Sequence, residues 1–286
     1  MIAPSVFALS WAGGGAERSF RRRRPGVDDL PWGTLRPADY PSVLVDRARL
    51  AWTDGAYVEW ATGYQLALIQ AALMRIRAPV DLVGMAGDFV ADEMLHVELH
   101  ARVVMELGGA VPYLVDDANL AAAPSLPEDL RFSAAEALLR TCCIGETLAV
   151  PMLAAAHRVA GHPLVEAVLA RIVEDEGPHA QLGWAFFEWA DDWLDDGQRA
   201  GLAAVARDEI AAMKHLWTLP NSRCAAGVTS EGFALGDVHA LGWLDTEAYL
   251  PLARATMRER VVARLRRHGI DVGELASLGL GEQGSD

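Results

Sequence analysis

Four long stretches of the sequence show apolar residues at helical periodicity, and this pattern restricts the fold more than any other feature. They cover about residues 42–77, 80–109, 132–160 and 163–194. Helices of roughly 30 residues span about 45 Å, a length that is typical of helix bundles. The sequence therefore predicts an all-α protein built on a four-helix bundle.

Proline and glycine residues mark the ends of these stretches. Pro79 follows the first stretch, and Gly108 and Gly109 follow the second. Gly161 and Pro163 predict a tight connection between the third and fourth helices. The predicted connection between the second and third helices is longer, as a crossover requires.

The third stretch carries two further signals. Ser133 and Glu136 match a capping box, which predicts that this helix begins beside Ser133. Pro151 lies inside the stretch, five residues after Glu146. Because proline cannot donate a backbone hydrogen bond, we expect a kink or a bulge in this helix.

The sequence outside the four stretches lies before and after the predicted bundle. The predicted parts are an extended basic N-terminal arm (1–40), the bundle (41–195), C-terminal helices packed on it (196–278) and a flexible tail (279–286). Two helices are expected in the third part, at about 197–217 and 246–268. The arm contains many glycine and proline residues, so we expect little regular structure there.

The charge distribution is asymmetric. The formal net charge is −14, yet residues 1–40 carry six arginines and four acids. The arginine run Arg21–Arg24 accounts for most of this basic segment. So acidic a chain is a poor candidate for binding nucleic acid. We expect the run to contact an acidic neighbour or the chain's own acidic body.

The cysteine residues and the hydropathy of the sequence indicate the cellular compartment of the protein. Cys142, Cys143 and Cys224 form no disulfide framework, which fits a reducing environment. The sequence shows no evident membrane span, and the first residues lack the basic segment that begins a signal peptide. We expect a cytoplasmic protein without a membrane partner.

Two of the four stretches contain the motif Glu-x-x-His, at Glu93 and His96 and at Glu176 and His179. A spacing of three residues places the carboxylate and the imidazole on one helix face, where both can bind one ion. Either motif alone also fits a solvent-exposed pair. The occurrence of two such motifs on two long helices favours a metal site.

The other two stretches each carry one glutamate on an apolar stripe, Glu59 and Glu146. With Glu93 and Glu176, the predicted core holds four carboxylates. Burying four ionised carboxylates costs several kcal/mol for each group unless cations neutralise them. Two divalent metal ions would supply the required charge.

These six residues resemble the ligand set of the ferritin-like carboxylate-bridged di-iron superfamily. The resemblance covers about residues 42–194 and matches all six ligand positions. It implies a ferritin-like four-helix bundle with a crossover connection. It also implies that Glu59, Glu93, His96, Glu146, Glu176 and His179 are both metal ligands and catalytic residues.

Asp92 and Asp175 precede the two motif glutamates. This pattern resembles the oxygen-activating branch, which includes bacterial multicomponent monooxygenases, acyl-carrier-protein desaturases and ribonucleotide reductase small subunits. There the aspartate holds the second nitrogen of a ligand histidine, which fixes its tautomer and raises its basicity. The resemblance implies this role for Asp92 and Asp175; the alternative is that they are ordinary solvated acids.

Several neighbouring residues are candidates for further roles. His100 lies one turn after His96 and is a candidate extra ligand, whereas Glu98 is expected to be solvated. Six residues lie one turn from the ligands and are predicted to line a substrate pocket: Thr62, Gly63, Cys142, Cys143, Ala149 and Val150. This small and mostly apolar lining favours an apolar or amphipathic substrate.

An oxygen-rich site with one imidazole per ion suits iron or manganese. We predict two iron ions, with a manganese–iron pair as a variant, and dioxygen as co-substrate. The predicted activity is hydroxylation, desaturation or N-oxidation of a small organic molecule, served by an unidentified electron donor. A homodimer is one assembly that we consider.

Two other functions remain open at this stage. A ferritin-like ferroxidase or iron store would need no organic substrate. A bundle that acts only as an interaction module would make the motifs coincidental.

Overall fold

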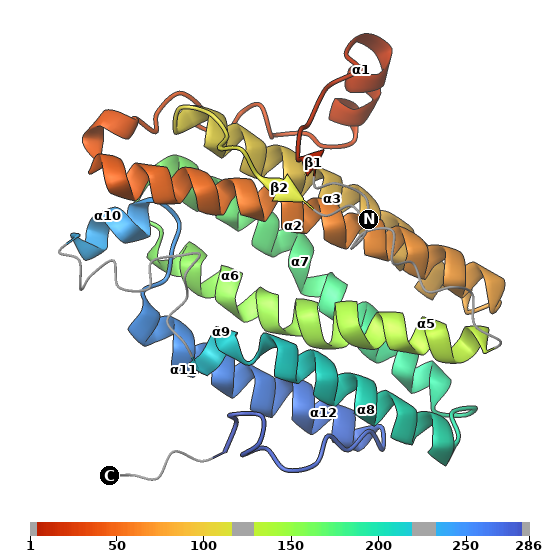
Figure 1. The fold of residues 1–286 in the computed structure, drawn as a ribbon. Coiled ribbons are helices and arrows are strands. Elements are labelled where there is room, and N and C mark those ends of the chain that lie inside the picture. The colour runs from red at the N-terminus through yellow and green to blue at the C-terminus, as the bar shows by residue number, and fades with distance from the viewer. Residues whose placement is uncertain (1–4, 116–128, 219–232, 282–286) are drawn as a thin grey trace, which may run out of the picture.

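The computed structural model of the chain describes residues 5–115, 129–218 and 233–281. Helices dominate this part of the chain, which confirms the prediction of an all-α protein (Figure 1). The strands described are β1 (Ser5–Val6) and β2 (Leu114–Val115), which form one short antiparallel pair. The fold is therefore set by the packing of helices against helices.

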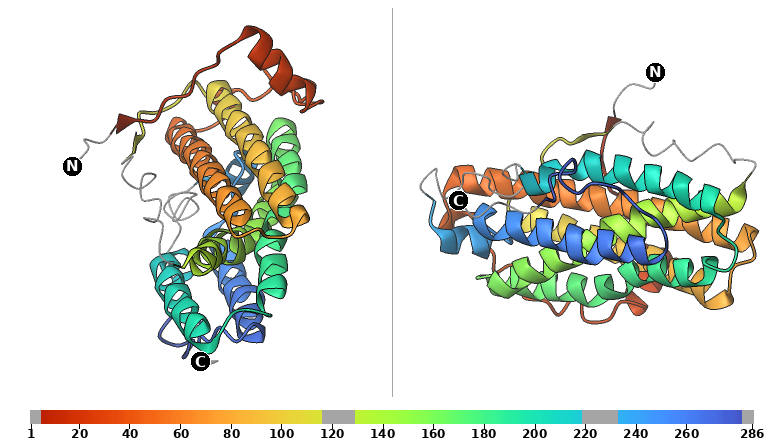
Figure 2. Two further views of the ribbon diagram at one scale, coloured as in Figure 1. Left: turned by 90° about the vertical axis from the view of Figure 1, so that its right-hand side faces the viewer. Right: turned by 90° about the horizontal axis from the view of Figure 1, so that it is seen from below.

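Four long helical segments match the four predicted stretches. They are α2 (Ser42–Arg75), α3 (Val80–Glu106), the continuous segment α5 (Leu130–Leu138), η2 (Leu139–Glu146) and α6 (Thr147–Val159), and α7 (Pro163–Ala190). Helix α2 packs against α3 and against α5–η2, while α7 packs against α3 and η2–α6 (Figure 2). The four segments thus enclose a common interior.

The third segment begins one turn earlier than predicted. Asp129 is its N-cap, and the carboxylate accepts hydrogen bonds from the backbone N–H groups of Arg131 and Phe132, each at 3.0 Å. The predicted capping box at Ser133 is therefore wrong. The Ser133 hydroxyl lies inside the first turn and donates to the Asp129 carbonyl at 3.1 Å.

The predicted irregularity in this segment takes the form of a π-helix, η2, which ends at Glu146. It lies just before the turn that contains Pro151. The Thr147 hydroxyl donates to the Cys142 carbonyl at 3.2 Å, five residues earlier, across the end of the π-helical turn. Short π-helical turns occur frequently at functional sites, and this one carries a candidate ligand.

Most C-terminal helices form a further layer beside α5–α6, on the side away from α2 and α3 (Figure 1): α8 (Asp196–Met213), α9 (His215–Thr218), α11 (Thr246–Thr256), η3 (Met257–Val262) and α12 (Ala263–Arg267). Helix α10 (Leu235–Ala240) instead lies at the end of the bundle and packs against α2. The flexible tail predicted from Gly279 is wrong for residues 279–281. Leu280 is fully buried, and the Arg254 guanidinium donates to the Gly279 carbonyl. Residues 282–286 lie outside the described residues.

The N-terminal segment contains α1 (Gly14–Arg22) and the short η1 (Pro37–Asp39), although an extended arm was predicted. Arg21 forms an ion pair with Glu98 of α3, and Arg24 donates to the Ala91 carbonyl at 2.6 Å. Glu98 is therefore buried rather than solvated, because the N-terminal segment covers it. The basic run contacts the acidic body of its own chain.

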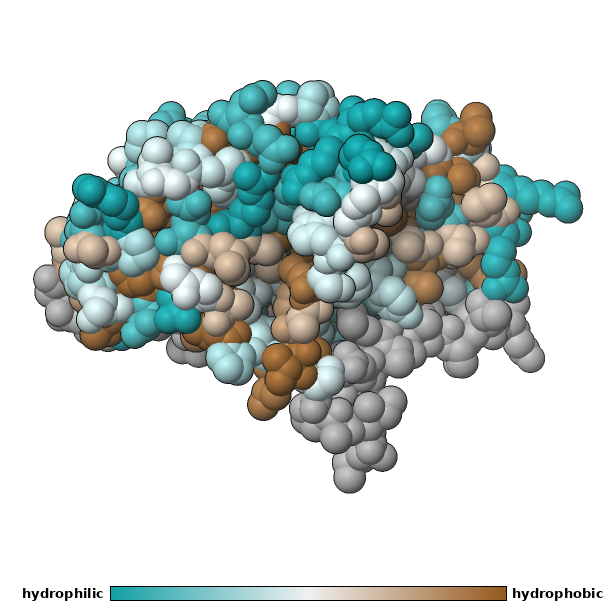
Figure 3. Space-filling view, turned by 90° about the horizontal axis from the view of Figure 1, so that it is seen from above, coloured by the Kyte–Doolittle hydropathy of each residue, from teal (hydrophilic) through white to brown (hydrophobic). Residues whose placement is uncertain are grey.

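The surface seen from above, the side from which α1 projects, is mainly hydrophilic with scattered hydrophobic residues (Figure 3). Inside the molecule, the helix Leu130–Val159 is long and apolar enough to cross a membrane by length and composition alone. The expectation of a chain without a membrane span stays a prediction, because length and composition alone do not distinguish a span from a core helix. Half of its most apolar window is buried here, as in the core helix of a bundle.

Helix α7 approaches η2 very closely at Gly183. A Cβ atom at this position would lie 2.6 Å from the Cys143 sulfur and 2.8 Å from the Cys142 Cβ. We expect Gly183→Ala to lower the free energy of unfolding by about 1–3 kcal/mol, because the packed interior cannot accommodate the methyl group. Urea denaturation measures this change.

Gly84 provides the matched control. It lies in helix α3, and a Cβ atom there would meet nothing within 4 Å. Gly84→Ala should stabilise the protein by about 0.5–1 kcal/mol through helix propensity. Equal effects of the two substitutions would show that the close contact at Gly183 does not exist.

Candidate metal centre

Residues from four helical segments meet in the interior of the bundle. We call this cluster the candidate metal centre: Glu59 from α2, Glu93 and His96 from α3, Glu146 from η2, and Glu176 and His179 from α7. Five of the six are buried, and the Glu59 side chain is 12% exposed. The six positions singled out in the sequence therefore lie together in space.

The cluster forms two overlapping groups of four residues. In each group, one ligand atom per residue lies within 4.8 Å of the others. The first group contains Glu59, Glu93, His96 and Glu176, and the second contains Glu93, Glu146, Glu176 and His179. Glu93 and Glu176 belong to both groups, so each carboxylate lies between two potential ion positions.

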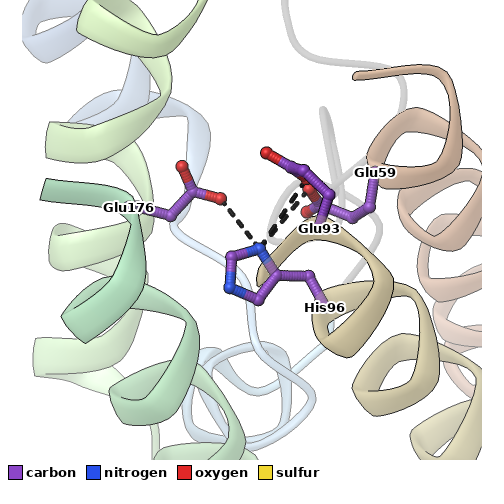
Figure 4. A group of neighbouring side chains, drawn as sticks. All are labelled: Glu59, Glu93, His96 and Glu176. Carbon is purple, nitrogen blue, oxygen red and sulfur yellow. Dashed lines mark ion pairs between the residues drawn. The ribbon is translucent and has the colours of Figure 1, made fainter. Parts of the chain in front are cut away.

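The two histidines point the same ring nitrogen into the cluster. The His96 Nδ1 atom lies 3.2 Å from the Glu176 Oε1 atom and 3.8 Å from the Glu93 Oε2 atom. The His179 Nδ1 atom lies 3.2 Å from both the Glu93 Oε1 and the Glu176 Oε2 atoms. Each shared carboxylate thus presents one oxygen to each histidine. Figure 4 shows the first group around His96.

The second ring nitrogens face aspartates in a crossed arrangement. The His96 Nε2 atom of α3 lies 3.3 Å from the Asp175 Oδ2 atom of α7. The His179 Nε2 atom of α7 lies 3.6 Å from the Asp92 Oδ2 atom of α3. Each aspartate therefore contacts the histidine of the opposite helix. Arg171, one turn before Asp175, forms an ion pair with it.

The pKa values of the carboxylates diverge because their surroundings differ. Burial, with the nearby charges of Glu176 and Glu93, raises the pKa of Glu146 well above its ordinary value. Burial also raises the pKa of Glu59 to about 7. Burial acts in the same direction on Glu93 and Glu176, but the adjacent imidazoles outweigh it and lower the pKa of both.

The histidines are shifted in the opposite sense. Although burial disfavours the imidazolium, contacts with Asp175 and Glu176 raise the pKa of His96 well above its ordinary value. Asp92 and Glu176 likewise raise the pKa of His179 to about 12. Protons on the two imidazoles and on Glu146 therefore balance much of the negative charge when no metal ion is bound.

Several buried atoms of the cluster have no hydrogen-bond partner among the described residues. They include both oxygens of Glu93 and the Nδ1 atoms of His96 and His179. Buried polar atoms are normally satisfied, so unsatisfied ones require an explanation. Carboxylate oxygens and imidazole nitrogens that converge without hydrogen bonds are suited to hold metal ions. The residues present thus fit a pair of bound cations.

His100 lies beside the cluster but outside both groups of four. Its Nδ1 atom is 2.9 Å from the His96 carbonyl oxygen, and its Nε2 atom is 3.9 Å from the Glu59 Oε1 atom. Its ring packs against Gly55, where a Cβ atom would come within 2.4 Å, and against Trp52. Burial lowers the pKa of His100. Its role as an extra ligand stays a prediction.

A cavity of about 410 Å³ lies between α6, α7 and the segment η3–α12, and its lining includes Thr147 and Gly177, which follow Glu146 and Glu176 in the sequence. Val150 lines it, but the other five predicted lining residues do not: Thr62, Gly63, Cys142, Cys143 and Ala149. Cys142 and Cys143 are fully buried, and Gly63 packs against Glu93 and Met94. Cys224 lies outside the described residues.

Three residues near the centre were not singled out in the sequence. Arg171 lies four residues before Asp175, and this helical spacing could have predicted their ion pair. Thr147 and Trp184 line the cavity, and the indole N–H of Trp184 donates to the Thr147 hydroxyl at 3.0 Å. No local pattern predicts this contact, because it joins two helices.

Comparison of the chain with models of protein families, with curated proteins and with solved structures finds no match. The functional argument therefore depends on the residues themselves.

Binding of two divalent ions at pH 7 should release about three to four protons per chain, because His96, His179 and Glu146 are protonated in the metal-free protein and Glu59, with a pKa of about 7, is about half protonated. Protons and metal ions compete for the same atoms. The apparent metal affinity should therefore fall as the pH is lowered from about 8 to about 5. Anaerobic titration with Mn²⁺ in a weakly buffered dye solution measures the release. Uptake without released protons would contradict the assigned protonation.

Asp175→Asn should weaken metal binding by about 10–100-fold, because the amide cannot orient His96 as the carboxylate does. Glu174→Gln is the matched control, since the Glu174 side chain is 76% exposed and adjacent in sequence. Equilibrium dialysis against Mn²⁺ compares the variants. If both bind as tightly as the parent, Asp175 does not support the centre.

Proposed function

We propose that this chain is a non-haem di-iron oxygenase or oxidase with a ferritin-like four-helix bundle. The observation that carries the proposal is the pair of overlapping four-residue groups that share Glu93 and Glu176. It supports a centre in which two ions would be held, each by one group of four, with Glu93 and Glu176 common to both. Glu59 and His96 would complete one ion position, and Glu146 and His179 the other.

The donor set supports iron. Each position would have one imidazole nitrogen and several carboxylate oxygens, a combination that suits iron or manganese better than zinc. Four carboxylates in a closed interior require compensating positive charge, and two divalent ions would replace the protons that otherwise provide it. When bound, two ferrous ions would supply the electrons for chemistry with dioxygen.

The chain's own residues would prepare the site for this chemistry. Asp175 accepts from the Nε2–H group of His96, and the Asp92 carboxylate lies 3.6 Å from the Nε2 atom of His179, so the Nδ1 atoms of both histidines face the ions. The ion pair with Arg171 keeps Asp175 in its carboxylate form. The buried walls exclude bulk water from the reacting atoms.

The cavity beside Glu146 and Glu176 supports a reaction on an organic molecule. Thr147 and Gly177, which line it, directly follow these two glutamates in the sequence. Its volume of about 410 Å³ lies within the range of small-molecule sites. An iron store needs no such space beside its ligands, so we favour the oxygenase over a ferroxidase.

Anaerobic loading with ferrous iron tests the centre. We expect two iron ions per chain, one for each group of four. Glu93→Ala should reduce the content to one ion or fewer, because Glu93 belongs to both groups. Asp88→Asn, an exposed substitution on the same helix, should leave it unchanged. Full iron content in Glu93→Ala would overturn the assignment of the centre.

A separate experiment distinguishes the oxygenase from an iron store. The oxygenase should remain a small assembly on size-exclusion chromatography and take up no iron beyond the two ions. With a reductant and ¹⁸O-labelled dioxygen, mass spectrometry should detect labelled or dehydrogenated product from candidate substrates. A large hollow oligomer that accumulates many more iron ions per chain would instead identify a store.

A further inference from the structure

The cavity beside the candidate metal centre has two contrasting walls. Its inner wall is formed by α6 and α7, through residues such as Thr147, Val150 and Gly177. Its outer wall is formed by η3 and α12, through Arg260 and Arg264. The segment α11–η3–α12 runs along α6 (Figure 2). A bound molecule would therefore lie between the bundle and the C-terminal layer.

The inner wall leads to the candidate ligands. Thr147 follows Glu146, Gly177 follows Glu176, and a Cβ atom at Gly177 would meet nothing within 4 Å. The indole of Trp184 is held by its hydrogen bond to Thr147, whose hydroxyl in turn donates to the Cys142 carbonyl. This wall combines apolar side chains, such as Val150 and Trp184, with the polar side chains of Gln181 and Glu188, and it reaches the immediate sequence neighbours of two candidate ligands.

The outer wall places two positive charges one turn apart. Arg260 and Arg264 are exposed, and neither forms an ion pair or a hydrogen bond within the described residues. The Arg264 guanidinium lies over the Trp184 ring, 5.0 Å from its centroid. Glu188 also lines the cavity but pairs with neither arginine. By contrast, Arg258 on the same segment pairs with Glu259.

Two adjacent like charges repel each other unless an anion lies between them. Guanidinium groups bind carboxylates and phosphates through paired N–H donors, and the aromatic contact restricts the motion of Arg264. In a chain of net charge −14, such a pair also offsets the repulsion that an anion would otherwise meet. These features favour an anionic ligand at the mouth of the cavity.

We propose that the cavity binds a small organic anion, with its carboxylate or phosphate group at Arg260 and Arg264. The apolar part of the molecule would lie along Val150 and Trp184, toward Glu146 and Glu176. This inference rests on the proposed function where it identifies the anion as the substrate. The volume of about 410 Å³ accommodates a molecule with one or two rings.

Isothermal titration of the metal-free 286-residue chain tests the anion site. The probes are phenylacetate, phenyl phosphate and the neutral analogue phenylacetamide. We expect at least one anion to bind 10-fold or more tightly than the amide, and the tighter of the two identifies the preferred group. Arg260→Gln and Arg264→Gln should each weaken its binding by about 10-fold, which corresponds to the loss of one charged partner. Arg267→Gln, on α12 but outside the cavity lining, should change nothing.

The proposal is overturned if neither anion binds more tightly than the amide, or if both cavity variants bind the anion as the parent does. The metal-free assay separates this outcome from failure of the proposed function. Iron content should be the same in the parent and in both arginine variants, because neither arginine contacts the ligands. If the protein binds iron normally but no anion, the anion site is wrong and the di-iron function still stands. If it binds the anion but no iron, the di-iron function is wrong and the anion site still stands.

Discussion

The structure depends on the need to place four carboxylates inside an apolar bundle. Glu93, Glu146 and Glu176 are buried and Glu59 nearly so, and four negative charges so close together cannot all persist without cations. The pKa shifts show how the charge is reduced in the absence of metal ions. The pKa values of Glu59 and Glu146 are raised, so these groups take up protons, whereas Glu93 and Glu176 keep their charge beside the imidazolium groups. Metal ions would neutralise the carboxylates in place of these protons. The unsatisfied atoms of Glu93, His96 and His179 converge where such ions would bind.

The crossed contacts mean that the geometry of the centre depends on how α3 and α7 pack together. Asp175 of α7 supports His96 of α3, and Asp92 of α3 supports His179 of α7. A shift of one helix along the other would break both contacts and separate the shared carboxylates. The N-terminal segment lies against the same helix pair, because Arg24 binds the Ala91 carbonyl immediately before Asp92. Helix packing and the geometry of the candidate metal centre are thus coupled.

Local sequence patterns predicted the long helices and the six residues of the cluster, because Glu-x-x-His spacing and apolar stripes are properties of single helices. What they missed depends on contacts between segments. Glu98 is buried because Arg21, distant in sequence, covers it. The crossing of the aspartates and the arginine-lined cavity likewise follow from packing. The N-cap is a local exception, because Asp129 accepts from Arg131 and Phe132 in its own first turn.

The central claim is that two ions share Glu93 and Glu176. Anomalous X-ray diffraction from crystals of the full chain grown with Mn²⁺ tests it most directly. Our account predicts two anomalous peaks, one among Glu59, Glu93, His96 and Glu176 and one among Glu93, Glu146, Glu176 and His179. A single peak, or peaks bound only by surface carboxylates while the cluster keeps its protons, would contradict it.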